Sequence, residues 1–239
     1  MQQLMSHLKK NHLARAVLCV AMACLAPASA SAATADEPPR ETLLDASAAK
    51  EVMAAFARCD TSFFTLLESR PRLLGRDVKM SIRGDAAAPA VQDPLLETGQ
   101  LQTFARHVNA SGLRLLAWRN EVSQDASLGA FLFWGFDVEG NPDAVAQMVN
   151  RMVEPGQRLS KLGSVWARPE FRRVGDPIDQ WRRGGQPGTV TKKGEVERVL
   201  LIEAHEVPGR SKLYCTLQGS VSATLIERTR PDLSPSLFP

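Results

Sequence analysis

Two long apolar segments joined by a short polar turn are the feature that most constrains the fold of this 239-residue chain. Residues 113–122 and 128–138 are rich in Leu, Phe and Trp, and the residues between them are Ser, Gln, Asp, Ala and Ser. Apolar runs that flank a compact polar connection are typical of a β-hairpin. The sequence therefore predicts an antiparallel strand pair within residues 113–138.

Apolar residues recur at helical spacing on both sides of this hairpin. Residues 43–58 place their apolar side chains on one face of a helix, and residues 62–67 predict a second, shorter helix. The spacing in residues 101–108 predicts a further helix, which an Asn-Ala-Ser-Gly sequence ends. Asn141, followed by Pro and Asp, supplies an N-cap and first turn for a helix beyond the hairpin. The chain is therefore predicted to alternate helices with strand pairs.

This alternation favours a single α+β domain at residues 42–228, with an antiparallel sheet and helices packed on one face. A helix followed by a strand pair occurs twice, so residues 42–140 and 141–228 are interpreted either as two similar halves or as a chance likeness. The tail, residues 229–239, contains three prolines and is predicted to be disordered. The other strands are predicted at residues 76–83, 163–167, 197–206 and 212–227, with loops at 84–94 and 169–193.

Residues 1–32 have the pattern of a secretory signal peptide. Positive residues precede ten uncharged apolar residues, 16–25, and the sequence Ala-Ser-Ala-Ser-Ala then offers two overlapping small-residue cleavage sites. We favour cleavage after Ala32, which leaves residues 33–41 as a flexible start of the mature chain. The protein is therefore expected in a bacterial periplasm or in the secreted fraction.

The leader has two other interpretations, a permanent membrane anchor and a lipid anchor. A permanent membrane anchor needs about 20 apolar residues, roughly twice the length of this run. Lipidation at Cys24 is the other alternative, because Ala-Met-Ala-Cys loosely resembles a bacterial lipobox, but the small-residue sites lie at a better distance from the apolar core. We therefore expect no stable membrane insertion after cleavage.

The charge balance of the chain depends on the leader. The whole chain has 29 Lys and Arg residues against 26 Asp and Glu residues, and three of the basic residues but none of the acidic ones lie in residues 1–32. The mature chain is therefore balanced in charge. This balance gives no reason to expect nucleic acid or an anionic membrane surface as a partner.

Two cysteines remain in the mature chain, Cys59 and Cys215. In an oxidising compartment, a single widely spaced pair favours one structural disulfide. A redox-active pair is the alternative, but it usually has the close Cys-x-x-Cys spacing that is absent here. The sequence thus predicts that the first helix is joined to one of the last strands.

Catalytic motifs are absent from the sequence. It contains no Gly-x-Ser-x-Gly, no His-Glu-x-x-His, no paired-cysteine zinc pattern and no Gly-rich phosphate loop, so no metal site and no cofactor are predicted. His205 lies between Glu203 and Glu206, and an imidazole beside a carboxylate can act as a general base. These three residues are the weak catalytic candidates.

A basic segment is the candidate binding site. Residues 172–193 contain six Lys and Arg residues against two Asp residues, together with Trp181. Trp and Arg are enriched at binding hot spots, and a long loop in a compact domain is more often functional or disordered than idle. The alternative is a solvated loop whose Trp181 folds back onto the core. The binding candidates are Arg172, Arg173, Trp181, Arg182 and Arg183.

Two classes of function follow from these patterns. The first is an exported, non-catalytic protein that binds an envelope protein or an anionic envelope component as an accessory or inhibitory factor. The second is a small periplasmic hydrolase that uses His205 with a nearby carboxylate. The absence of catalytic motifs favours the first class, so an enzyme is the less expected outcome.

Overall fold

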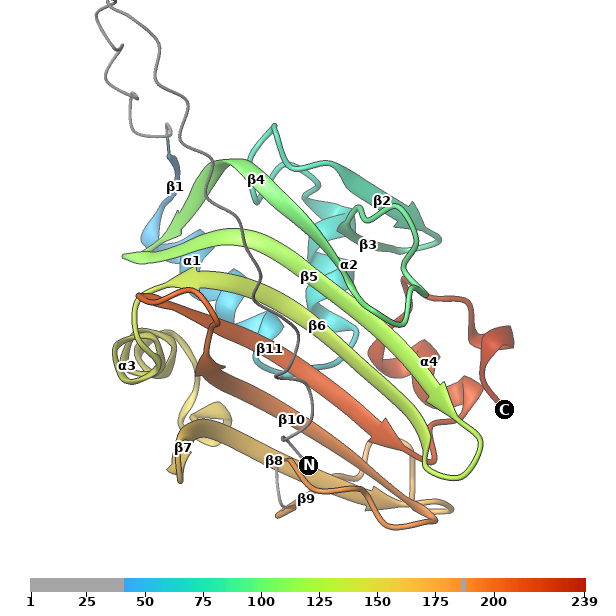
Figure 1. Cartoon of the computed structure of the whole chain (residues 1–239). Coiled ribbons are helices and arrows are strands. Elements are labelled where there is room, and N and C mark those ends of the chain that lie inside the picture. The colour runs from blue at the N-terminus through green and yellow to red at the C-terminus, as the bar shows by residue number, and fades with distance from the viewer. Residues whose placement is uncertain (1–40, 186–187) are drawn as a thin grey trace, which may run out of the picture. The chain divides into compact units, whose positions relative to one another are not determined.

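A computed structural model describes residues 41–185 and 188–239, and the predicted signal peptide lies outside the described residues. The described part has a mixed α/β fold with a large, mostly antiparallel sheet (Figure 1). The strand order is β1-β4-β5-β6-β11-β10-β8-β7, with β9 paired to β8, and only the β1–β4 pair is parallel. The strands are β1 (Thr42–Leu44), β4 (Gln100–Ala110), β5 (Leu113–Asp125), β6 (Gly129–Glu139), β7 (Ser160–Leu162), β8 (Val165–Arg173), β9 (Arg182–Arg183), β10 (Glu195–Ala204) and β11 (Arg210–Gly219).

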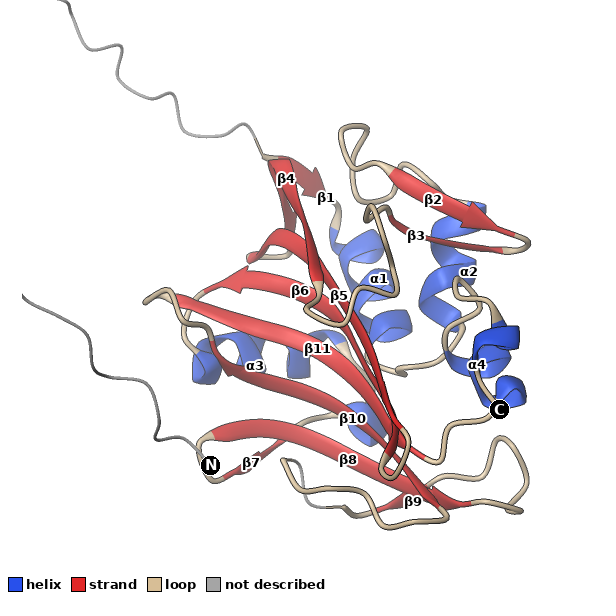
Figure 2. Cartoon of the chain, turned by 45° about the vertical axis from the view of Figure 1, so that its right-hand side comes forward, coloured by secondary structure: helices blue, strands red, loops and turns tan. Residues whose placement is uncertain are grey.

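A two-stranded sheet and four α-helices complete the described fold. Figure 2 shows the small β2–β3 sheet beside α2. Short 3₁₀ turns follow α3 and α4, at Pro155–Gln157 and Pro235–Leu237. The elements are β2 (Met80–Arg83), β3 (Ala86–Pro89), α1 (Ala46–Phe56), α2 (Ser62–Ser69), α3 (Pro142–Met152) and α4 (Ala223–Thr229).

The predicted hairpin forms the centre of the large sheet as β5 and β6. Its inward aromatic side chains make the contacts that hold the first two helices. The Phe63 ring of α2 stacks on Trp118 of β5 at 5.5 Å between centroids, and Phe56 of α1 lies 5.2 Å from Phe136 of β6. Aromatic side chains bury large apolar areas, and each ring pair adds about 0.5–1.5 kcal/mol beyond that burial. The hairpin therefore positions the helices as well as the neighbouring strands.

The helix that begins at Asn141 is confirmed. The Asn141 side chain accepts a hydrogen bond from the Ala144 amide at 2.9 Å, and Pro142 occupies the first turn. Val145, Val149 and Met152 are buried along one side of α3, as their spacing predicts.

The predicted helix at residues 101–108 is wrong, because these residues form most of strand β4. The register between β4 and β5 shifts between Thr103 and Val108, which is the signature of an irregularity in the strand. Phe104, Val108 and Ala110 are buried at even spacing, as expected for one face of a strand, whereas Leu101 and Ala105 are exposed. The helical spacing therefore came from combining buried and exposed apolar residues of one strand.

The prediction of one strand over residues 212–227 is wrong in its second half. Strand β11 ends at Gly219, whose φ of 103° is unfavourable for other residues, and α4 follows. The Ser222 side chain caps this helix by accepting a hydrogen bond from the Leu225 amide. The predicted loops also contain short strands, because β3 lies within 84–94 and β9 within 169–193.

The tail after residue 229 was predicted to be disordered, but the structure describes it as packed. Leu233 and Phe238 are buried in the core, and the Ala223 amide donates a hydrogen bond to the Pro239 carbonyl. Arg230 is 1% exposed, and its guanidinium lies 5.0 Å from the Trp134 ring centroid. These contacts to distant residues order a proline-rich segment that local sequence alone makes irregular.

The disulfide between Cys59 and Cys215 is confirmed. Cys59 follows α1 with a φ of 53°, and Cys215 lies in the middle of β11. Both residues are buried, so the bond ties the turn between the first two helices to the sheet.

Candidate functional site

The basic segment, residues 172–193, begins at the end of β8 and folds around an acidic residue. The Asp176 carboxylate accepts hydrogen bonds from the Arg173 amide at 2.9 Å and from Arg182 Nη2 at 3.2 Å. The first of these bonds is the main cause that holds the pKa of Asp176 below its ordinary value. Arg172 Nη2 donates a hydrogen bond to the backbone carbonyl of Asp176. Residues 172–182 therefore form a turn that hydrogen bonds within the segment stabilise.

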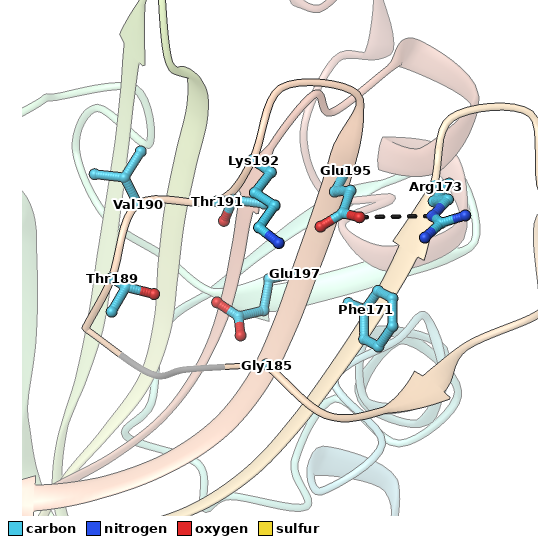
Figure 3. A pocket seen from close by; sticks show the side chains of 9 residues that line it. All are labelled: Phe171, Arg173, Gly185, Thr189, Val190, Thr191, Lys192, Glu195 and Glu197. Carbon is cyan, nitrogen blue, oxygen red and sulfur yellow. Dashed lines mark ion pairs between the residues drawn. The ribbon is translucent and has the colours of Figure 1, made fainter.

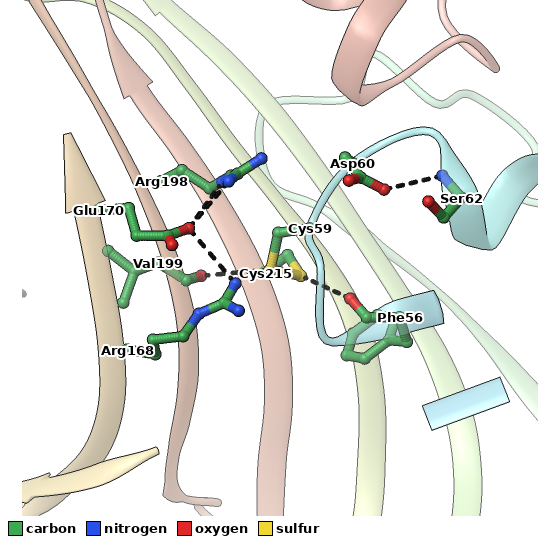
Figure 4. Close-up of a disulfide and its surroundings, with 9 residues drawn as sticks. All are labelled: Phe56, Cys59, Asp60, Ser62, Arg168, Glu170, Arg198, Val199 and Cys215. Carbon is green, nitrogen blue, oxygen red and sulfur yellow. Dashed lines mark hydrogen bonds and ion pairs between the residues drawn. A yellow bond between two sulfur atoms is a disulfide. The ribbon is translucent and has the colours of Figure 1, made fainter. Parts of the chain in front are cut away.

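Trp181 packs toward the core. The guanidinium of Arg198 lies 4.2 Å from its ring centroid, and Arg198 pairs with Glu170 at 2.9 Å. Arg168 approaches the same carboxylate at 3.5 Å, beside the disulfide (Figure 4). Burial lowers the pKa of Arg168 to about 10, so the group keeps its charge at neutral pH. Of the two interpretations of Trp181, the geometry favours the one in which it folds back onto the protein.

The predicted arginines do not gather into one exposed patch. Arg172 is 6% exposed, whereas Arg173, Arg182 and Arg183 are exposed. Arg173 pairs with Glu195 at 3.6 Å, Arg182 bonds to Asp176, and Arg183 donates to the Gly156 carbonyl. These side chains therefore hold the segment against its neighbours.

A groove of about 840 Å³ lies beside this segment. The turn between β5 and β6 forms one wall, the segment forms the other, and residues 220–222 contribute the end. Leu128, Val174 and Val190 line it and are exposed. Three cations also line it, namely Arg172, Lys192 and Lys193, together with Pro239, the last residue of the sequence, and the described lining side chains include no Asp or Glu.

The sequence predicts only the charged part of this groove. Arg172 and the two lysines belong to the basic segment, but the three exposed aliphatic residues were not predicted to belong to a binding site. The sequence does contain a signal for two of them, because Val174 and Val190 lie within the predicted loop 169–193, and aliphatic side chains that stay exposed in a loop indicate a binding surface. Leu128, by contrast, was assigned to the hairpin strand, and only the fold brings it to the same surface.

A second cavity of about 530 Å³ adjoins the groove and shares Val190, Thr191 and Lys192 with it (Figure 3). The Glu197 carboxylate lies in its wall and accepts a hydrogen bond from Gln218 Nε2 at 2.5 Å. Its lining carries charges of both signs, in contrast to the groove.

The catalytic candidates lie elsewhere, around His205. The Val207 amide donates to His205 Nδ1 at 2.9 Å, which assigns the proton of the neutral ring to Nε2. Nε2 lies 3.4 Å from Oδ2 of Asp137, and Asp137 also pairs with Arg119. Both ring nitrogens are therefore engaged within the protein, and the described residues give His205 no hydrogen bond to a hydroxyl.

The two flanking glutamates pair with a lysine. Lys212 Nζ lies 2.5 Å from Glu206 and 3.8 Å from Glu203. The hydrogen bond from Lys212 is the main cause that lowers the pKa of Glu206 to about 2. A carboxylate held in this way is a weak base at neutral pH, so the arrangement offers little support for the hydrolase interpretation.

Residues 41–185 and 188–239 contain no cluster of three His, Cys, Asp or Glu side chains able to hold a metal ion. Within the same ranges, no helix has both the length and the apolar character required to cross a membrane. Comparisons with protein-family models, curated proteins and solved structures each gave no match.

Proposed function

We propose that this chain is an exported, non-catalytic binding protein of the bacterial envelope. The leader pattern in residues 1–32 supports export, and the disulfide between Cys59 and Cys215 is compatible with an oxidising compartment. Binding of an envelope protein or component, as an accessory or inhibitory factor, is the role that we infer for the mature chain.

The groove beside residues 172–193 carries the proposal. It combines exposed aliphatic side chains with three cationic side chains, and none of its described lining side chains is Asp or Glu. Exposed apolar surface next to charge of one sign is characteristic of recognition sites. We infer that the groove is the binding site. It includes Arg172 from the predicted binding residues, but its lining lacks Arg173, Trp181, Arg182 and Arg183.

The arrangement of the helices supports the same assignment. We infer that the helices cover one face of the large sheet, because α1 contacts β4 and α3 contacts β8, β10 and β11. The helices and the sheet then share one core, and the loops at the strand ends are left for binding. We infer that the sheet and its helices hold the β5–β6 turn and residues 172–193 in place for binding.

Charge reversal in the groove tests the proposal. We expect the double substitution Lys192→Glu and Lys193→Glu to reduce capture of the native partner from a periplasmic extract at least tenfold, because both cations line the groove. Lys79→Glu is the control, since Lys79 is exposed and does not line the groove. Equal capture by all three proteins, with unchanged melting temperatures, would contradict the proposal.

A further inference from the structure

Arg172 gives the groove a buried positive charge. The residue is 6% exposed and lines the groove, and its Nε has no hydrogen-bond partner among the described residues. Its Nη2 donates to a backbone carbonyl, that of Asp176, which carries no formal charge. The described anion near this guanidinium is the Asp176 carboxylate, whose pKa the charge of Arg172 helps to lower. A further anion in the groove would add to this attraction, because charge-assisted interactions are the strongest that a guanidinium forms.

The two lysines extend this positive charge to the rim. Lys192 and Lys193 follow one another in the chain and both line the groove, so an anion near Arg172 would meet three cations. Asp176 accepts hydrogen bonds from the Arg173 amide and from Arg182, and it also attracts Arg172 electrostatically. Lys192 and Lys193, in contrast, form no ion pair with a described residue, so these two charges are free to select an anionic ligand.

The exposed aliphatic side chains of the groove favour a ligand that also has an apolar part. Val174 and Val190 are 63% and 59% exposed, and Leu128 is 41% exposed on the facing turn. Covering such surface with an aliphatic chain is favourable by the hydrophobic effect. The volume of about 840 Å³ lies within the range of roughly 300–1,000 Å³ that is usual for sites that bind small molecules.

We propose that the groove binds a single-chain anionic amphiphile, namely a medium- or long-chain fatty acid. Its carboxylate would lie among Arg172, Lys192 and Lys193, and its chain would cover Leu128, Val174 and Val190. The inference rests on the proposed function, because it names the envelope component that the groove binds. Binding is reversible and involves no covalent step.

Titration of the purified, disulfide-bonded protein with dodecanoate, below its micellar concentration, tests the assignment. Calorimetry is expected to give saturable binding of one dodecanoate per protein. The double substitution Lys192→Glu and Lys193→Glu is expected to weaken binding at least tenfold, because it removes two cations that would contact the carboxylate. Val190→Asp is expected to weaken binding similarly, because it removes an apolar contact with the aliphatic chain. Lys79→Glu should bind as the wild type does. These substitutions are at exposed positions, so each variant is expected to fold.

Three probes distinguish the chemistry of the head group. Dodecanol and dodecyltrimethylammonium have the same chain without the negative charge, and both are expected to bind at least tenfold more weakly than dodecanoate. Lysophosphatidylglycerol has a phosphate in place of the carboxylate, and tighter binding of this lipid would overturn the fatty-acid assignment. Absence of dodecanoate binding, or equal binding by all the protein variants, would overturn it as well. If dodecanoate fails while charge reversal still abolishes capture of a protein partner, only the ligand class is wrong and the proposed function stands.

Discussion

At the scale of single residues, Arg230 is the buried charge on which the end of the chain depends. Its guanidinium donates to Asn120 and Asp232, both at 2.7 Å, and lies over the Trp134 ring. Arg230→Ala would leave a buried amide and carboxylate without their partner. We expect it to lower the free energy of unfolding by about 3–5 kcal/mol, measured by chemical denaturation.

The neighbouring Arg228 is the matched control, because it is exposed in the last turn of α4, the helix that Arg230 follows. Arg228→Ala should change the free energy of unfolding by no more than about 0.5 kcal/mol. Equal effects of the two substitutions would mean that Arg230 is not a buried link between the tail and the sheet.

Arg230 and His205 each contact a partner that the sequence does not predict, because that partner is distant in the chain. The proline content of the tail is local information, whereas the partner Asn120 of Arg230 is 110 residues away. His205 likewise has acidic neighbours in the sequence, but Asp137, which faces its ring, comes from a distant strand. Partners that meet only across the sheet leave no local pattern.

At the scale of elements, Asp143 links α3 to the β7–β8 hairpin. Its carboxylate accepts hydrogen bonds from Lys161 Nζ and from the Trp166 indole at 2.6 Å. The bond from Lys161 is the main cause that lowers the pKa of Asp143 below its ordinary value. The link therefore stabilises the fold above the ordinary carboxyl pKa, about 3.9, and is lost as the pH falls through the lowered value.

Acid titration of tryptophan fluorescence measures this link. Loss of the Asp143 bond should change the Trp166 signal at a pH below the ordinary carboxyl pKa, before global unfolding. Asp143→Asn should remove that transition, and the difference between the two curves isolates Trp166 from the other tryptophans. Identical curves would show that the carboxylate does not hold the hairpin.

Elements with strong local signals were predicted correctly, and the rest required the fold. The β5–β6 hairpin and α3 have uninterrupted apolar spacing and, for α3, a cap in the sequence. Strand β4 was predicted as a helix because the exposed Leu101 and Ala105 add helical spacing to the buried Phe104 and Val108. The helix α4 was not predicted because it closely follows strand β11. The groove was found only in part, since its aliphatic residues come from separate loops that meet at one end of the sheet.

At the scale of the whole molecule, the disulfide closes most of the described chain into one loop. Cys59 and Cys215 are 156 residues apart, and closing so long a loop stabilises a fold by roughly 5 kcal/mol on the chain-entropy model. Replacing both cysteines by serine should therefore lower the free energy of unfolding by about that amount. A reducing agent should lower the stability of the wild type to the same level and leave the double variant unchanged.

The central claim is that the groove beside residues 172–193 is a binding surface, and site-specific photo-crosslinking in the cell tests it most directly. A photoreactive amino acid would replace Val190, which is 59% exposed in the groove, or Leu43, which is 74% exposed in β1. The account predicts a crosslinked product from position 190 that Lys192→Glu and Lys193→Glu suppress, and none from position 43. Products of equal yield from both positions, or none from position 190, would contradict it.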